Sequence, residues 1–292
     1  MRYGGVEAGG TKWVCAIGSG PDDLDELVTF PTTSPAETIE RTAEFFASNG
    51  AVAAVGIGSF GPIDLHEGSP TWGRITTTPK PGWAGTDVGS ALARALDVPV
   101  ALDTDVNAAA LGEHRWGAAV GLDTFCYITV GTGIGGGGMA NGRLMHGLQH
   151  PEFGHMRVPH DRDLDPFDGV CPYHGDCLEG LASGEAIRAR WGSPPEDSAD
   201  EWVWSLEAEY LALGLVNVIC TVSPQRIVLG GGVMKQARLL PLVRGRVRDL
   251  LAGYIKAREL EDDDLGAYIV TPALGDRAGV LGSLELARSC VS

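Results

Sequence analysis

Apolar and polar residues alternate along this chain in a pattern that predicts strands and helices in turn. Short apolar runs predict buried strands, and apolar residues spaced three and four apart predict amphipathic helices. Strands are predicted at about 1–18 (a hairpin), 52–59, 98–102, 124–142 (a second hairpin), 226–229 and 267–271. Helices are predicted at about 36–48, 87–96, 108–113, 182–191, 200–222, 236–253 and 276–286. This alternation favours sheets covered by helices, the α/β class.

The order of the predicted elements repeats. A hairpin with a glycine-rich turn opens the chain, and a second such hairpin starts after about residue 117, each with helices further on. A chain of 292 residues is long enough to bury two cores. We therefore expect a small lobe of residues 1–116 with a C-terminal helix at about 275–292. The large lobe would cover 117–274 and carry an irregular insertion at about 150–180.

Charge and composition exclude several classes of protein. The net charge is −16, and an acidic surface repels phosphodiester backbones, so we expect no nucleic-acid partner. No apolar run approaches the ~20 residues that span a bilayer, and no signal-peptide pattern opens the chain. Six cysteines do not form a dense disulfide framework in a chain of this length. We expect no membrane association and a cytoplasmic location.

The segment Asp103–Asn107 joins a predicted buried strand to a predicted helix. Open α/β sheets place their ligands at the carboxyl ends of parallel strands, so a carboxylate here points to a site. Asp and Asn also cap helices in proteins that have no chemistry at that position, and we expect them at capping positions here. The segment alone leaves both interpretations open.

Three glycine-rich turns follow predicted strands, at 7–12, at 131–138 with six glycines in eight positions, and at 230–232. Glycine permits positive φ and lets backbone N–H groups approach an anion closely, which suits phosphate binding. Any one of these turns could be an ordinary hairpin turn. The chain has neither a Walker A loop nor a dinucleotide fingerprint in a βαβ setting. The presence of three such turns, on both halves of the chain, favours phosphate binding.

Cys171, His174 and Cys177 are separated by two residues each, and the intervening loop can bring His155 back to them. Two thiolates and two imidazoles suit tetrahedral zinc, and a closed four-ligand site is structural. A cytosolic disulfide or a coincidence would be the alternatives.

His150 and His160 are spare candidates if one metal ligand is misassigned, while His146 looks like an ordinary polar residue. Glu152 and Glu179 flank the cluster, and paired acids of this kind bind sugar hydroxyl groups. As isolated residues they would more often be solvated surface acids.

Together these residues resemble the ROK family of sugar kinases and sugar-responsive regulators over nearly the whole chain. The matching segments are 9–12, 105–113, 130–136, 152–155 and the Cys/His cluster. Within the family, residues 7–12, 60–64 and 75–83 are most similar to bacterial fructokinases. The resemblance implies an actin-like ATPase fold, in which two ribonuclease-H-like lobes bind sugar and ATP in an interlobe cleft.

The resemblance also implies roles for individual residues. Asp105 would be the catalytic base that takes the proton from the attacking sugar hydroxyl. The substrate-binding positions would be Asn107, Glu152, His155 and Glu179. The nucleotide-binding positions would be Gly9, Gly10, Thr11, Lys12, Gly131, Thr132, Gly133, Gly230, Gly231 and Gly232. ATP, Mg²⁺ and a structural Zn²⁺ bound by His155, Cys171, His174 and Cys177 would be the cofactors, and a homodimer the assembly.

Two positions depart from the family pattern. Most members have Asp where this chain has Glu7, which puts a role of that residue with magnesium in doubt, and many have Cys in place of His174. The function implied is ATP-dependent phosphorylation of D-fructose to fructose 6-phosphate. A kinase for glucose, mannose or an amino sugar differs only in pocket detail. A non-catalytic sugar sensor is disfavoured, because the regulators carry an added N-terminal DNA-binding domain and this chain starts at the phosphate motif.

Overall fold

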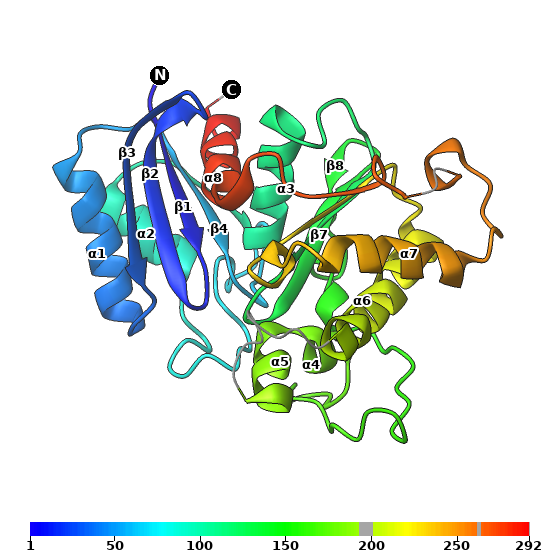
Figure 1. Cartoon of the computed structure of the whole chain (residues 1–292). Coiled ribbons are helices and arrows are strands. Elements are labelled where there is room, and N and C mark those ends of the chain that lie inside the picture. The colour runs from blue at the N-terminus through cyan, green and yellow to red at the C-terminus, as the bar shows by residue number, and fades with distance from the viewer. Residues whose placement is uncertain (193–200, 262–263, 292) are drawn as a thin grey trace. The chain divides into compact units, whose positions relative to one another are not determined.

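A computed structural model describes residues 1–192, 201–261 and 264–291. The chain divides into two compact units. Figure 1 shows the whole chain, coloured by residue number from the N-terminus to the C-terminus. Unit 1 comprises Met1–Gly121, Leu144–Pro151 and Ala273–Ser292, and unit 2 comprises Leu122–Arg143 and Glu152–Pro272. The segment 144–151, which the sequence places in the second lobe, belongs to unit 1.

Unit 1 is built on a five-stranded sheet with the order β3-β2-β1-β4-β5. The strands are β1 (Tyr3–Ala8), β2 (Lys12–Gly20), β3 (Asp23–Pro31), β4 (Val55–Ser59) and β5 (Val100–Thr104). β1, β2 and β3 form an antiparallel meander, whereas β4 and β5 continue the sheet parallel to β1. The carboxyl ends of β1, β4 and β5 therefore meet at one edge, as the sequence-based argument requires.

Unit 2 repeats this topology with the order β10-β9-β6-β7-β8. Its strands are β6 (Phe125–Val130), β7 (Ile134–Ala140), β8 (Arg143–Leu144), β9 (Ile227–Gly230) and β10 (Ile269–Val270). β6 and β7 form the antiparallel hairpin, and β9 and β10 run parallel to β6. Read in the opposite direction, this order is β8-β7-β6-β9-β10, which corresponds strand by strand to β3-β2-β1-β4-β5 of unit 1. The predicted duplication is therefore present as a repeat of topology.

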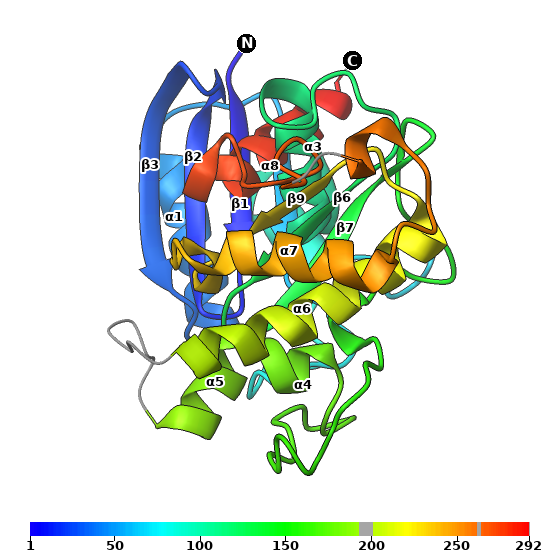
Figure 2. The ribbon, with the colours of Figure 1, turned by 45° about the vertical axis from the view of Figure 1, so that its right-hand side comes forward.

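Helices cover the sheets within each unit. Those of unit 1 are α1 (Pro35–Ser48), α2 (Val88–Leu96), α3 (Asp105–Trp116) and α8 (Ala278–Ser289). Those of unit 2 are α4 (Leu178–Ala182), α5 (Gly184–Trp191), α6 (Glu201–Val222) and α7 (Leu239–Leu251). In unit 1, α3 packs on α8, which lies across β1, β2 and β4, while α1 and α2 lie on the opposite face of the sheet. In unit 2, α6 and α7 lie side by side (Figure 2).

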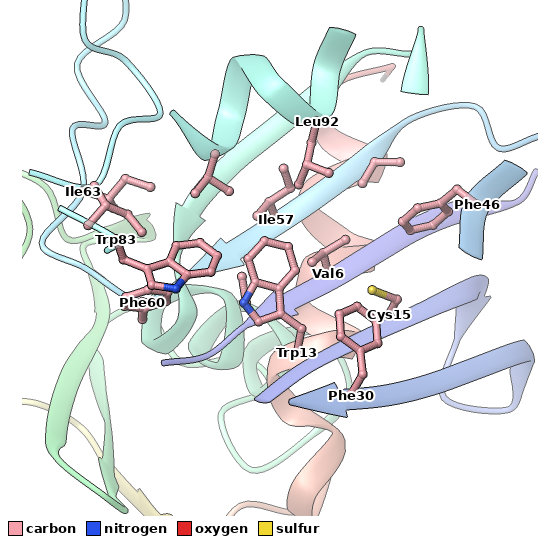
Figure 3. Packing of buried hydrophobic residues seen from close by; sticks show 14 of the residues in the cluster. Val6, Trp13, Cys15, Phe30, Phe46, Ile57, Phe60, Ile63, Trp83 and Leu92 are labelled. Atoms are coloured by element: carbon pink, nitrogen blue, oxygen red, sulfur yellow. The ribbon is translucent and has the colours of Figure 1, made fainter. Parts of the chain in front are cut away.

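The largest cluster of buried side chains in unit 1 lies between its sheet and α1 and α2 (Figure 3). The rings of Trp13 and Trp83 lie 5.8 Å apart, and Phe60 packs edge-on against Trp83 at 5.4 Å. Trp83 belongs to the irregular stretch before α2, yet it is fully buried and its indole N–H donates to the Thr33 carbonyl. Burial of this ring fixes a segment that has no regular secondary structure.

Small residues bring α3 and α8 close together on the other face. A Cβ at Gly282 would lie 1.6 Å from the Ala108 carbonyl oxygen, and a Cβ at Gly112 would lie 2.6 Å from that of Ala278. Both distances are shorter than a non-bonded contact between a Cβ and a carbonyl oxygen tolerates, so glycine allows this backbone approach. The catalytic candidate Asp105, in the first turn of α3, is thereby placed against a rigid support.

Two strand predictions need correction. β3 is missed by the sequence analysis, because it is an edge strand with a mostly exposed and acidic sequence that shows little apolar alternation. The predicted glycine turn at 131–138 is shorter in the structure, since β7 begins at Ile134 and its glycines pair with β6. A Cβ at Gly136 would lie 2.6 Å from the Phe153 ring, so close packing explains glycine within this strand.

One helix of the described chain, α6, is long and apolar enough to cross a membrane by length and composition alone, although Glu207 and Glu209 interrupt its apolar residues. More than half of its most apolar stretch is buried inside the protein. It also carries the buried acid Glu207 among residues such as Trp204 and Tyr210. These are the properties of a core helix of unit 2.

Candidate active site

Asp105 is the first residue of α3 and directly follows β5. The helix is capped by Thr104, whose hydroxyl accepts the Asn107 N–H at 3.1 Å, so the predicted capping by Asp or Asn is wrong. The Asp105 carboxylate accepts the N–H of Val106 at 2.9 Å. Asp105 therefore lies at the positive, N-terminal end of the helix dipole.

Asp103 and Asn107, on either side of Asp105, bond to each other. Asn107 is fully buried and its Nδ2 donates to Asp103 Oδ1 at 2.9 Å, where the Thr104 N–H also donates at 2.7 Å. The other oxygen of Asp103 lies 2.9 Å from Nε2 of His146. The Asn107 amide nitrogen thus helps to position Asp103, and a substrate-binding role for Asn107 stays a prediction.

Glu7 lies at the end of β1, near Asp105. Its Oε2 is buried and makes no hydrogen bond within the part of the chain that the structure describes. Burial and, next, the charge of Asp105 raise the pKa of Glu7 to about 7, against the opposing effect of Lys12. Glycine at position 279 makes room for this side chain, because a Cβ there would lie 2.6 Å from Glu7 Oε2.

The first glycine turn, Gly9–Thr11, joins β1 to β2. The Gly9 N–H donates to the Lys12 carbonyl at 3.0 Å, and the Gly9 carbonyl accepts the Thr32 hydroxyl at 2.7 Å. Neither Gly9 nor Gly10 has a positive φ, so the predicted reason for glycine is wrong here. A Cβ at Gly9 would instead lie 2.8 Å from the Lys12 carbonyl oxygen, which makes close approach the reason.

The second turn, Gly131–Gly133, joins β6 to β7 and is held by the start of α5. The Gly131 carbonyl accepts the Gly184 N–H at 2.7 Å, and the Thr132 carbonyl accepts the Glu185 N–H at 3.3 Å. This support was not predicted, because its one signal in the sequence is the Ser183 cap of α5. The helix start therefore fixes the turn, within which the Gly131 N–H donates to the Gly133 carbonyl at 2.9 Å.

The third turn, Gly230–Gly232, lies next to the second. Gly231 has φ of 97°, and a Cβ there would lie 2.3 Å from the Val130 carbonyl oxygen at the end of β6. Glycine is required on both counts. The structure thus brings two of the three predicted nucleotide turns together within unit 2.

Glu152, His155 and Glu179 are also brought together in unit 2. Glu152 precedes a single 3₁₀ turn, Phe153–His155, whose last residue is His155, and Glu179 lies in the first turn of α4. The pKa of Glu152 is raised to about 7 by partial desolvation, although its side chain keeps solvent access, and secondly by the charge of Glu179. Glu179 accepts the Ile134 N–H at 2.9 Å, which ties this acid to the Gly131–Gly133 turn.

His155, Cys171, His174 and Cys177 offer four ligand atoms that all lie within 4.8 Å of one another. The two Nδ1 atoms are 3.3 Å apart, and the sulfur–nitrogen distances are 3.6 to 3.7 Å. A tetrahedral zinc ion with bonds of about 2.0–2.1 Å to nitrogen and about 2.3 Å to sulfur requires about 3.3 Å and about 3.6 Å. The four residues therefore fit zinc in both ligand type and spacing.

The two spare histidines lie outside this cluster. His160 bonds to the Asp165 carbonyl and to Asp176, whereas His150 accepts the Ile63 N–H in unit 1. Arg157 donates to the His174 carbonyl at 2.9 Å and to Asp176 at 2.6 Å. These bonds hold the loop around the cluster and leave the four predicted ligands as a closed set.

Comparisons with known proteins show the family to which the chain belongs. The model of the ROK family matches residues 3–290. A putative fructokinase from Bacillus subtilis is 47% identical, covering 99% of this chain and 96% of the relative, and a fructokinase from Zymomonas mobilis is 45% identical, covering 98% and 96%. Among solved structures, a ROK family glucokinase from Streptomyces griseus in complex with glucose and AMPPNP has a TM-score of 0.76 and 25% identity, covering 99% of this chain and 100% of that one.

Proposed function

Because the chain belongs to the ROK family, we propose that it is an ATP-dependent fructokinase that converts D-fructose to fructose 6-phosphate. The similarity to bacterial fructokinases over nearly the whole chain carries the fructose assignment. The bound AMPPNP of the glucokinase relative, an analogue of ATP, supports ATP as the phosphoryl donor.

Asp105 is the catalytic base of this proposal. Its carboxylate would accept the proton of the sugar hydroxyl group as the oxygen attacks the terminal phosphorus atom of ATP. General-base catalysis of this kind contributes about 10²–10⁴-fold to a rate. The rest of the acceleration comes from positioning and from stabilisation of charge on the transferred phosphoryl group.

Glu152, His155 and Glu179 are the proposed sugar-binding residues. Two carboxylates close enough to raise the pKa of Glu152 suit a ligand that donates several hydroxyl hydrogens. Nδ1 of His155 faces the cysteine cluster, which leaves Nε2, on the opposite edge of the ring, for a sugar hydroxyl.

The glycine turns at 9–11, 131–133 and 230–232 are the proposed sites for the nucleotide. The N–H groups of Gly9 and Gly131 are bonded within their own turns, so the other N–H groups of these turns would meet the phosphate oxygens. Lys12 would add a positive charge. Magnesium bound with ATP would neutralise phosphate charge, and the unbonded Oε2 of Glu7 supports a place for this residue beside the cation.

Zinc is proposed at His155, Cys171, His174 and Cys177, where it would fix the loop that carries the sugar-binding acids. The fit of the interatomic distances to a tetrahedron supports this assignment. We also propose a cytoplasmic location and a homodimer, the latter to be checked by light scattering. The six cysteines are free, as expected in a reducing compartment.

Initial rates of ADP release across a panel of hexoses test the function. D-fructose should give the highest kcat/KM, with mannose or glucose weaker. Phosphoglucose isomerase and glucose-6-phosphate dehydrogenase should convert the fructose product quantitatively, since only phosphorylation at the 6-position gives their substrate. The Asp105→Asn variant, purified in parallel, controls for contaminating kinases.

A higher kcat/KM for glucose, mannose or an amino sugar would replace the fructose assignment and keep the kinase. If the protein binds a sugar but forms no ADP from ATP with any hexose of the panel, a non-catalytic sensor would be favoured instead.

A further inference from the structure

We propose that His146 is a positioning residue for phosphoryl transfer, acting through the buried carboxylate of Asp103 on the helix turn that carries Asp105. The inference rests on the proposed function of Asp105 as the base. His146 has no part in the family pattern described above, and its role follows from its contacts within unit 1.

Asp103 is a buried carboxylate that must be compensated. Only 4% of its side chain is exposed, and three donors reach it: the Thr104 N–H, Asn107 Nδ2 and His146 Nε2. The first two are neutral, so His146 is the partner able to carry a compensating charge. Without such a charge, a carboxylate at this depth would take up a proton or move toward solvent.

Either response would disturb the first turn of α3. Asn107 Nδ2 is held by Asp103, and the Asn107 N–H is held by the capping hydroxyl of Thr104. In the sequence, Asp105 lies between Thr104 and Asn107, which are both held by these bonds. A shift of Asp103 would therefore reorient the turn that presents Asp105, and a misplacement of about 1 Å costs up to about 10²-fold in rate.

His146 lies in the segment 144–151, which has further contacts with the rest of unit 1. Nε2 of His66 lies 2.6 Å from the Leu148 carbonyl, and His150 accepts the Ile63 N–H at 3.2 Å. These contacts place the segment 144–151 independently of Asp103. They provide a control, because His66 anchors the same segment without touching Asp103.

The ionisation of His146 gives the pairing a pH dependence. The hydrogen bond from Asp103, with a contribution from its charge, raises the pKa of His146 above the ordinary value of 6.5, against the effect of burial. The ion pair is therefore complete below about pH 6.5 and is lost as the pH rises through the raised pKa. Neutral His146 can still donate a hydrogen bond from Nε2, so deprotonation removes the charge and leaves the hydrogen bond.

Among the described residues, His150 and Cys290 are other ionisable groups near His146. Burial lowers the pKa of His150 and raises that of Cys290. His66 and Glu67 line the same 860 Å³ cavity as His146 and Asp103. A His66→Gln variant therefore serves as the control for His146→Gln.

The test compares His146→Gln with His66→Gln, using the best hexose of the panel from pH 5.5 to 9. Glutamine retains a hydrogen-bond donor but cannot carry charge. His146→Gln should lower kcat about tenfold at pH 6 with the KM for ATP unchanged, and it should match the parent at high pH. His66→Gln should keep the parental profile. Equal kcat values of parent and His146→Gln at pH 6, or a loss shared by His66→Gln, would overturn the proposal.

NMR titration of the full chain without substrate decides the inference independently of activity. The Asn107 side-chain amide and the Val106 amide should shift with the pKa of His146 in the parent. In Asp103→Asn these amide shifts should disappear, and the pKa of His146 should fall. If the chemical shifts of these amides do not change as His146 ionises, the coupling is refuted, even if the chain phosphorylates fructose. Absent turnover with intact coupling would instead refute the proposed function alone.

Discussion

At the residue scale, Asp105 combines a strand end with a helix start, so its carboxylate is held by backbone that cannot easily move. Asp105→Asn should lower kcat by at least about 10²-fold, because an amide keeps the shape but cannot accept the proton. Thermal melting and fructose binding should remain close to those of the parent. Asp97→Asn, at the C-cap of α2 in the same unit, is the matched control and should be fully active. Turnover of Asp105→Asn within about tenfold of the parent would contradict the assignment.

A second residue-scale prediction concerns Glu7 and Gly279. Gly279→Ala places a methyl group 2.5 Å from Glu7 Cδ, so Glu7 must move. We expect a several-fold higher KM for magnesium–ATP. Glu7→Asp together with Gly279→Ala should recover part of the loss, because aspartate is one methylene shorter. If Gly279→Ala has the same KM for magnesium–ATP as the parent, the close packing of Glu7 against Gly279 does not contribute to nucleotide binding.

Some candidate site residues leave a local pattern in the sequence and others do not, for physical reasons. Asp105 follows an apolar run, and the metal cluster has a regular spacing, so both leave a local pattern. His146 leaves none, because its partner Asp103 is 43 positions away. The buried state of Asn107 also depends on packing that the local sequence does not encode.

At the scale of elements, the contact between α3 and α8 depends on glycine. Gly282→Ala should destabilise the protein by about 1–3 kcal/mol or more, because its Cβ would overlap the Ala108 carbonyl and push the helices apart. Gly245→Ala in α7 is the control, since no atom lies within 4 Å of its Cβ, and it should be neutral or stabilising by up to about 1 kcal/mol. Denaturant titrations of both variants measure the difference. Parental stability of Gly282→Ala would show that the helices have room to separate.

Most elements follow from apolar periodicity, and the exceptions have identifiable causes. β3 is an exposed acidic edge strand and gives little apolar signal. The glycines of β7 read as a loop because glycine is rare inside strands, and the structure explains them by the close packing of Phe153.

At the scale of the whole molecule, zinc should couple the order of one segment to sugar affinity. Removal of the metal should weaken fructose binding and speed hydrogen exchange across 150–180, because few apolar side chains hold that loop. Nucleotide binding, measured with magnesium restored, should change less. Metal analysis should return about one zinc per chain.

Cysteine variants sharpen this test. Cys177→Ser should lose zinc, whereas Cys220→Ser, an exposed cysteine on α6, should retain it. Fructose affinity unchanged in zinc-free protein would refute the coupling, even with the four ligands correctly assigned.

The chain of unit 1 is discontinuous, and this has a consequence for its synthesis. All five strands of its sheet precede unit 2 in the sequence, whereas α8, which covers one face of that sheet, follows unit 2. We therefore expect the nascent sheet to keep Val14, Ala16 and their neighbours uncovered until α8 has been synthesised. We expect ribosome-bound chains that lack α8 to recruit chaperones, while unit 2 is already compact. A helix made late in synthesis thus decides when the first strands become native.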